Sequence, residues 1–121
     1  MANPNIVSVS SIYGKTHQVA LDTTVTTDIL SCASNKLYKI NYIVIENVDG
    51  SNSATVTMGI IKSGVSVILI AKTIAVPADA TLVLVDKNWG LYLEEADAIQ
   101  CLASSTSDFT CTISYEILDD A

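Results

Sequence analysis

Apolar and polar residues alternate with a period of two along much of the chain. In the clearest example, the segment 109–117, every second residue is apolar and the residues between are Thr, Ser or Glu. This alternation places one face of a β-strand in a core and the other in water. The segment 56–60 shows the same pattern. No segment has the 3.6-residue period of an amphipathic helix, so the sequence predicts an all-β protein.

Two further segments are apolar on both strand faces. In 37–47 the even-numbered face is largely apolar, and the odd-numbered face becomes apolar in its second half. The segment 65–75 has the same character. Strands of this kind are buried on both faces, and a thin sandwich covers only one. We therefore expect a neighbouring subunit or an overlying arm to cover the other face. The candidate contact residues are Ile43, Ile45, Val67 and Leu69.

Turn-forming residues divide the chain into short runs. Polar or Gly- and Pro-containing segments occupy 49–53, 77–79, 88–90 and 104–108, and Ser63-Gly64 is typical of a tight hairpin. Weaker strand candidates, rich in Thr and Ser, are 7–13, 18–22 and 25–32. Turns at intervals of about ten residues are typical of sandwiches and barrels. The sequence predicts a single-domain antiparallel β-sandwich over residues 1–121, jelly-roll-like, with about eight strands.

The composition favours self-association. Half of the residues are hydrophobic but only 16% are charged, against about 25% in an average globular protein. An isolated subunit with so few charges leaves apolar surface uncovered, which predicts a homo-oligomer. Residues 1–6 are the candidate for an extended arm, and the apolar Ile6 and Val7 at its end are further candidate contacts.

The charge pattern argues against nucleic-acid and membrane binding. The formal net charge is −7, and the six basic residues are single, scattered lysines with no arginine. Phosphate backbones and anionic lipids are bound by clustered Lys and Arg. Residues 1–5 lack the basic and apolar parts of a signal peptide, and the longest apolar stretch, 65–76, contains Lys72 and is too short to cross a bilayer. We expect a soluble protein made in a cytoplasm.

Three cysteines, Cys32, Cys101 and Cys111, lack the spacing of a zinc or redox site. Cys101 and Cys111 flank a predicted hairpin centred near Thr106, so a cross-strand disulfide between them is geometrically conceivable. In a reducing compartment, however, cysteines act as small buried hydrophobic residues, and that interpretation is favoured.

No group of residues matches a known catalytic or cofactor-binding pattern. His17 is the single histidine and has no nucleophile or metal-type spacing beside it. Glu94, Glu95 and Asp97 could offer oxygen ligands to a hard cation, but their spacing fits a solvated turn better. The single tryptophan, Trp89, is expected to cover an end of the sandwich. The sequence predicts a non-enzymatic protein with no catalytic residues, metal site or cofactor.

Several short segments, in a consistent order over nearly all of the chain, resemble small virion structural proteins of tailed bacteriophages, particularly those of marine and cyanobacterial hosts. These segments are 1–7 (MANPNIV), 11–15 (SIYGK), 47–50 (NVDG), 71–78 (AKTIAVPA), 91–95 (LYLEE) and 114–116 (SYE). None of them is a catalytic motif. One departure concerns the paired acids: related proteins tend to have glycine after them, whereas this chain has Ala96, so this turn is not expected to need a positive φ.

The resemblance implies a component of the virus particle without fixing its location there. We expect a capsid decoration (cement) protein that oligomerises, as a trimer, and contacts the major capsid protein or another virion protein. The alternative is a binding module at the tail, neck or fibre. Its loops, around Asn52, Trp89 and Thr106, would then face a sugar or protein of the host surface.

Overall fold

The computed structural model describes residues 7–21, 27–62, 67–105 and 109–119, and within them it is built almost entirely of strands. The strands are β1 (Ser11–Leu21), β2 (Thr27–Ser31), β3 (Lys36–Asn47), β4 (Ala54–Ile61), β5 (Ile68–Val76), β6 (Thr81–Val85), β7 (Leu91–Leu93), β8 (Ala98–Ala103) and β9 (Phe109–Asp119). One 3₁₀ turn, η1 (Lys87–Trp89), joins β6 to β7. The predicted all-β class is confirmed.

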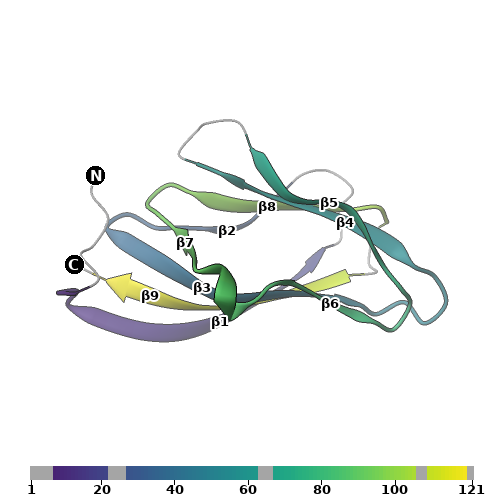
Figure 1. The fold of residues 1–121 in the computed structure, drawn as a ribbon, viewed down its shortest axis with the longest axis horizontal. Helices are drawn as coiled ribbons and strands as arrows, with labels where there is room; N and C mark the ends of the chain where they lie inside the picture. Colours follow the sequence, from purple (N-terminus) through teal and green to yellow (C-terminus); the bar gives the residue numbers. More distant parts are fainter. Residues whose placement is uncertain (1–6, 22–26, 63–66, 106–108, 120–121) are drawn as a thin grey trace.

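The strands form two layers that face each other across the core (Figure 1). The first sheet has the order β1-β9-β3-β6, and β7 also pairs with β3; the second has the order β2-β8-β4-β5. Every pairing is antiparallel. The pairs β1–β9, β2–β8, β3–β6 and β4–β5 are nested in the sequence, as in a long hairpin folded into two sheets. This arrangement is consistent with the predicted jelly-roll-like sandwich.

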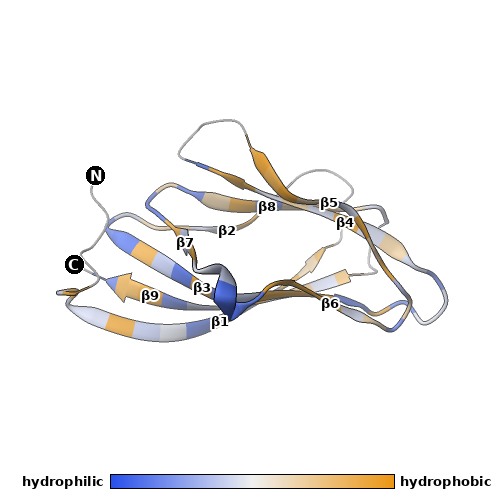
Figure 2. Ribbon diagram, viewed as in Figure 1, coloured by the Kyte–Doolittle hydropathy of each residue, from blue (hydrophilic) through white to orange (hydrophobic). Residues whose placement is uncertain are grey.

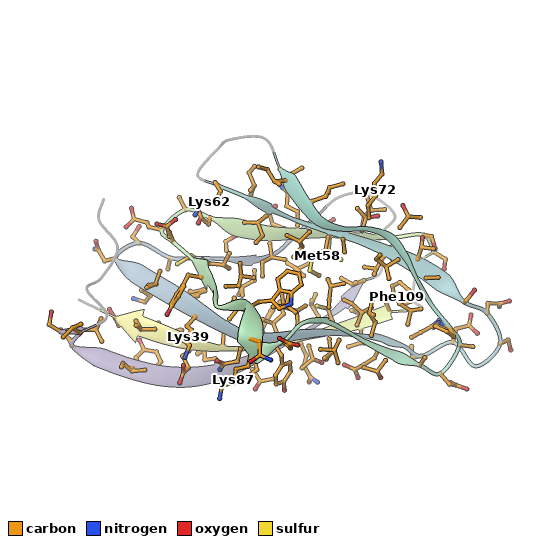
Figure 3. All side chains as sticks on the ribbon, in the orientation of Figure 1. Lys39, Met58, Lys62, Lys72, Lys87 and Phe109 are labelled. Carbon is orange, nitrogen blue, oxygen red and sulfur yellow. The ribbon has the colours of Figure 1, made fainter. Side chains whose placement is uncertain are left out.

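The core lies between the sheets and follows the period-two pattern. The apolar residues of β9 from Phe109 to Ile117 are buried, and Val56 and Met58 of β4 face them from the second sheet. In Figure 3 the side chains of Met58 and Phe109 lie between the layers, whereas Lys39, Lys72 and Lys87 lie on the outside. The strongest sequence signal therefore places the core correctly.

Two local expectations about strands differ from the structure, and one expected turn lies outside the described residues. The segments 7–13 and 18–22 were expected as separate strands, but residues 11–21 form the single strand β1 because all eleven pair with β9 without interruption. The hairpin expected around Thr106 is wrong: β8 and β9 lie in opposite sheets. Ser63-Gly64 and Thr106 themselves lie outside the described residues, although β4 and β5 do pair.

The two faces of β3 exchange roles part-way along the strand. The register with β9 runs from Ile40 opposite Tyr115 to Tyr42 opposite Ser114, which makes Asn41 the extra residue of a β-bulge. Before the bulge Tyr38 and Ile40 face the core, and after it Ile43 and Ile45 do, both with 0% exposure. The expectation that Ile43 and Ile45 face a partner is therefore wrong, because the bulge turns them inward.

Candidate interaction surfaces

The outer face of the first sheet carries an apolar depression, which we call the outer patch. It has a volume of about 540 Å³ and is lined by Asn41, Tyr42, Val44, Val83, Asp86, Lys87 and Ser114. Val83 is 57% exposed and Tyr42 is 40% exposed. These side chains come from β3, β6, β9 and the start of η1. The bulge at Asn41 produces the patch, because the residues that face outward after it include Tyr42 and Val44.

A buried acceptor without a donor lies in the outer patch. The side-chain oxygen Oδ1 of Asn41 is buried and makes no hydrogen bond. Every other buried side-chain nitrogen or oxygen of the described residues has a hydrogen-bond partner. A buried polar atom left unpaired costs roughly 1–3 kcal/mol. Because this oxygen is buried within the single chain, the unpaired acceptor is a local cost of the bulge and not a contact point that a partner reaches.

Charged residues flank the outer patch on one side. The carboxylate of Asp86 caps η1 by accepting a hydrogen bond from the backbone N–H of Asn88 at 2.9 Å. Lys87 follows it and makes no ion pair with any described residue. The patch thus combines an apolar centre with a polar border, which is the composition of a protein contact surface.

The second apolar surface lies on the opposite side of the sandwich and is called the β5 patch. It consists of Val67 and Leu69, which are 36% and 44% exposed, whereas Ile68 between them belongs to the other face of the strand. β5 is drawn largely in the hydrophobic colour in Figure 2. A groove of about 240 Å³ beside it is lined by Thr57, Gly59, Val67, Leu69, Gln100 and Leu102. Val67 and Leu69 are thus exposed, so their expected role as contacts stays a prediction.

A glycine allows β5 to lie close to β4 at this groove. A Cβ atom on Gly59 would lie 2.7 Å from Cγ2 of Val67 and 2.8 Å from the backbone oxygen of Ile68. Distances of this size are steric clashes, so any larger residue would push the start of β5 outward. Gly59 therefore sets the shape of the β5 patch.

The acidic turn forms an internal ion-pair cluster. The Lys62 ammonium at the end of β4 donates to Oδ2 of Asp97 at 2.6 Å and also to the carboxylate of Glu94. Asp97 is buried and accepts a further hydrogen bond from the backbone N–H of Glu94. The hydrogen bond to Asp97, followed by that to Glu94, raises the pKa of Lys62. Glu95 instead accepts from the backbone N–H of Asn35 at 2.7 Å. The arrangement ties β4 to the β7–β8 turn, and a lysine occupies the place where a cation would be held.

The turn also corrects one expectation. Ala96 has a φ of 69°, in the left-handed region, so this position does need the positive φ that was not expected of it. Its backbone N–H donates to the oxygen of Cys32, which fixes the conformation. A glycine here would adopt the same backbone without the steric cost of a Cβ atom.

The other residues that the sequence suggested as functional do not gather at one site in the described part of the chain. Trp89 is 53% exposed on η1, beside the middle of β3, whereas Asn52 lies in the loop beyond the end of that strand. The structure does not bring these two together, and Thr106 lies outside the described residues. His17 is half-buried on β1. Val7 is exposed, and Ile6 lies outside the described residues.

The three cysteines are buried and free. Burial raises the pKa of Cys32 to about 11 and that of Cys101 to about 12, and it raises the pKa of Cys111 as well. Such thiols stay protonated at neutral pH and react slowly. Cys101 and Cys111 are thus unbonded, and all three cysteines contribute to the core.

Within the described residues, no group of three or more His, Cys, Asp or Glu side chains could hold a metal ion. No helix in the described part of the chain is long and apolar enough to span a bilayer.

The fold is similar to that of a bacteriophage capsid chain. A chain in the acid-stable capsid of Helicobacter pylori bacteriophage KHP30 matches with a TM-score of 0.50 and 6% identity, over 94% of this chain and 92% of that one. A chain of infectious bursal disease virus, Gx strain, matches with a TM-score of 0.48 and 12% identity. The match covers 91% of this chain, which spans about a third (32%) of the length of the bursal disease virus chain. At these identities the similarity concerns the fold alone.

A non-viral protein is also among the structural matches. The Drosophila NLP core matches with a TM-score of 0.42 and 18% identity, over 88% of this chain and 98% of that one. No protein-family model matches the chain. No curated protein sequence matches it either.

Sequence reasoning missed two features of these surfaces. Asn41 looked like an ordinary polar strand residue because it continues the alternation begun by Lys39, and nothing in the local sequence marks it as a bulge. Lys62 was not connected with the acidic turn, because it lies 35 residues before Asp97 in the chain and no local pattern links them.

Proposed function

We propose that this chain is a non-enzymatic structural protein of a bacteriophage virion, and more specifically a capsid decoration (cement) protein. It would assemble with itself as a trimer and bind the major capsid protein or another virion protein. The segments that resemble small phage virion proteins support this proposal, as does the full-length fold similarity to a phage capsid chain. The observation that carries it is the outer patch, an apolar depression with the exposed side chains of Val83 and Tyr42 that a partner could cover.

The arrangement of the two patches suits a protein that joins neighbours. The outer patch and the β5 patch lie on opposite faces of the sandwich, so one subunit can contact two neighbours at once. Buried apolar surface contributes about 25 cal/mol per Å². Repeated over many identical sites, the burial of such apolar surface would strengthen the shell against the internal pressure of packaged DNA. The net charge of −7 keeps the protein from binding that DNA.

The copy number on purified particles tests the location. A decoration protein covers the shell and is present in hundreds of copies per particle, whereas a tail, neck or fibre component is present in few. Quantitative gel analysis of intact particles, scaled to the major capsid protein, gives this ratio. A low copy number would reject the decoration role and favour the alternative, a host-binding module at the tail.

Substitution in the outer patch tests the contact itself. We expect Val83→Asp to fold normally, because Val83 is largely exposed, but to lose most of its binding to particles that lack the wild-type protein. The matched control is Ser31→Asp, which adds the same charge at an exposed position of β2. Equal binding of the two variants would show that the outer patch does not contact the shell.

A further inference from the structure

The four sheet edges differ in how far they are protected from added strands. β2 has only five residues and a register shift between Asp28 and Leu30. β5 has two register shifts against β4. The edge beyond β3 is divided between the short strands β6 and β7. Short edge strands and bulges are the usual means by which proteins prevent unwanted strand addition.

The edge formed by β1 lacks these protections. β1 has eleven residues, pairs with β9 through an unbroken register, and contains no proline. Among the described residues no strand pairs with its other side. The backbone groups that point away from β9 therefore form an uninterrupted row of donors and acceptors along about 36 Å of strand, at roughly 3.3 Å per residue, and no described strand pairs with them.

The first half of β1 is also uncovered on both faces. Its six residues from Ser11 to Thr16 are all exposed, and they include Ile12 at 59% and Tyr13. The inner face becomes buried only toward Val19 and Leu21. This half of the strand is therefore held mainly by its pairing with β9. A strand that projects in this way gains both hydrogen bonds and apolar contacts when a second strand is added.

We propose that the outer edge of β1 pairs with β1 of a second copy of this chain, antiparallel and about a two-fold axis at Thr16. The two five-stranded sheets then form one continuous sheet. This register pairs all eleven residues of both strands, which is the largest number of backbone hydrogen bonds that the edge can make. A two-fold contact uses the same surface on both copies, and it is the commonest symmetry of homo-oligomers.

The side chains of β1 complement one another in this register. Tyr13 faces Val19 of the second copy, and aromatic residues opposite β-branched ones are favourable cross-strand pairs. Ile12 faces Ala20 of the second copy, which covers its exposed side chain. Thr16 faces Thr16 of the second copy at the axis, a pair that can share a hydrogen bond. Lys15 faces His17 of the second copy and not another lysine.

Charge favours a second copy at this edge over other parts of the surface. Two chains with a net charge of −7 repel each other, but the segment 11–21 contains no carboxylate. The nearest acids of β9 are already paired: Asp119 with Lys36 at 3.2 Å and Glu116 with Lys39 at 3.6 Å. The β1 edge is therefore a place where two copies can approach without bringing free carboxylates together.

This contact does not depend on where the protein works. It differs from the three-fold contact of the proposed trimer, and the two contacts together would give a dihedral assembly of two trimers. Purified protein tests the contact, whereas copy number on particles tests the proposed function. Either can fail without the other.

Engineered cysteines test the register. The native cysteines are buried, so a new surface cysteine is the reactive thiol of the folded protein. Opposed residues in an antiparallel pair have Cα atoms within the range of a disulfide. We expect Thr16→Cys to form a covalent dimer under mild oxidation at least tenfold faster than Lys72→Cys, the control on the bulged β5 edge.

Two further variants fix the geometry. Gly14→Cys and Gln18→Cys should each stay monomeric on a non-reducing gel when oxidised alone, but should cross-link when mixed, because Gly14 faces Gln18 of the second copy.

Thr16→Lys should weaken self-association at least tenfold in sedimentation experiments, relative to Ser31→Lys, which has the same charge. Circular dichroism checks that each variant is folded. Equal cross-linking of Thr16→Cys and Lys72→Cys, or no cross-link in the mixture, would overturn the proposal.

Discussion

The edge strands β1 and β5 show two ways in which a sheet can end. β1 is mostly polar and is paired with β9 in an unbroken register. β5 is strongly apolar, and its register with β4 shifts twice, so that its backbone does not present a regular row of hydrogen-bonding groups. The more hydrophobic edge is thus the irregular one. An apolar edge with an uninterrupted row of backbone hydrogen-bonding groups would be an aggregation site, whereas a polar edge can keep such a row and use it for specific pairing.

The largest expected effects on the free energy of unfolding come from two glycines, Gly59 on β4, which packs against the start of β5, and Gly14 on β1. Gly59→Ala should lower the free energy of unfolding by about 2 kcal/mol, because its new Cβ would clash with Val67 and with the backbone of Ile68. The matched change on β1 is Gly14→Ala, where a Cβ would meet no atom within 4 Å. It should raise the free energy of unfolding by about 0.5 kcal/mol, since alanine loses less chain entropy in a strand. Urea unfolding measures both, and similar values for the two would contradict the difference between the edges.

A smaller effect on the free energy of unfolding is expected at Thr73, which lies where the register of β5 against β4 shifts. Thr73 has a φ of 53°, a conformation that is costly for a β-branched residue, and its backbone N–H donates to the Thr57 hydroxyl at 3.0 Å. Thr73→Gly keeps this hydrogen bond and removes the strain, so we expect a gain of about 1 kcal/mol in thermal or urea unfolding. Lys72→Gly, one residue earlier, should instead cost about 0.5 kcal/mol or more. A loss of stability in both variants would show that Thr73 is not strained.

The smallest expected effect is on the titration of Tyr13 on β1. The Tyr13 hydroxyl donates a hydrogen bond to Asp119 at 2.9 Å, and this bond raises the pKa of Tyr13 above its ordinary value of 10.0. Because the folded-state pKa is the higher one, the bond contributes its stability below pH 10 and loses it as the pH rises through the folded-state pKa. Ultraviolet titration should show a late-titrating component that is lost in Tyr13→Phe and titrates earlier in Asp119→Asn, whereas Tyr115, whose pKa is raised by burial, should titrate late in both variants. Unchanged titration in Asp119→Asn would assign the late group elsewhere.

The sequence predicts the sandwich well because the period-two signal is strong wherever a strand has one buried face. Residues 109–117 are the clearest case: their apolar positions are buried in the core as the pattern predicts. The same reasoning fails at Ile43 and Ile45. One inserted residue, Asn41, exchanges the two faces of β3, and whether a residue is bulged depends on the partner strand and not on local sequence.

The interaction surfaces are less predictable for a similar reason. Val67 and Leu69 were expected as contacts because their segment is apolar on both faces; they are exposed in the single chain, and their role as contacts stays a prediction. The outer patch was not expected, because it depends on β3, β6 and β9 meeting at one point of a sheet. The pairing of Lys62 with Asp97 and the positive φ of Ala96 likewise arise from contacts between distant segments.

The position of β9 between β1 and β3 has a consequence for synthesis on the ribosome. Ser11 pairs with Asp119 and Leu21 with Phe109, so two strands of the first sheet stay apart until the segment that joins them has been translated. A nascent chain that stops before Phe109 cannot complete this sheet or close the core. In the proposed assembly, only polypeptides translated through β9 would present a complete first sheet, and fragments left by interrupted translation would be excluded without a separate quality check.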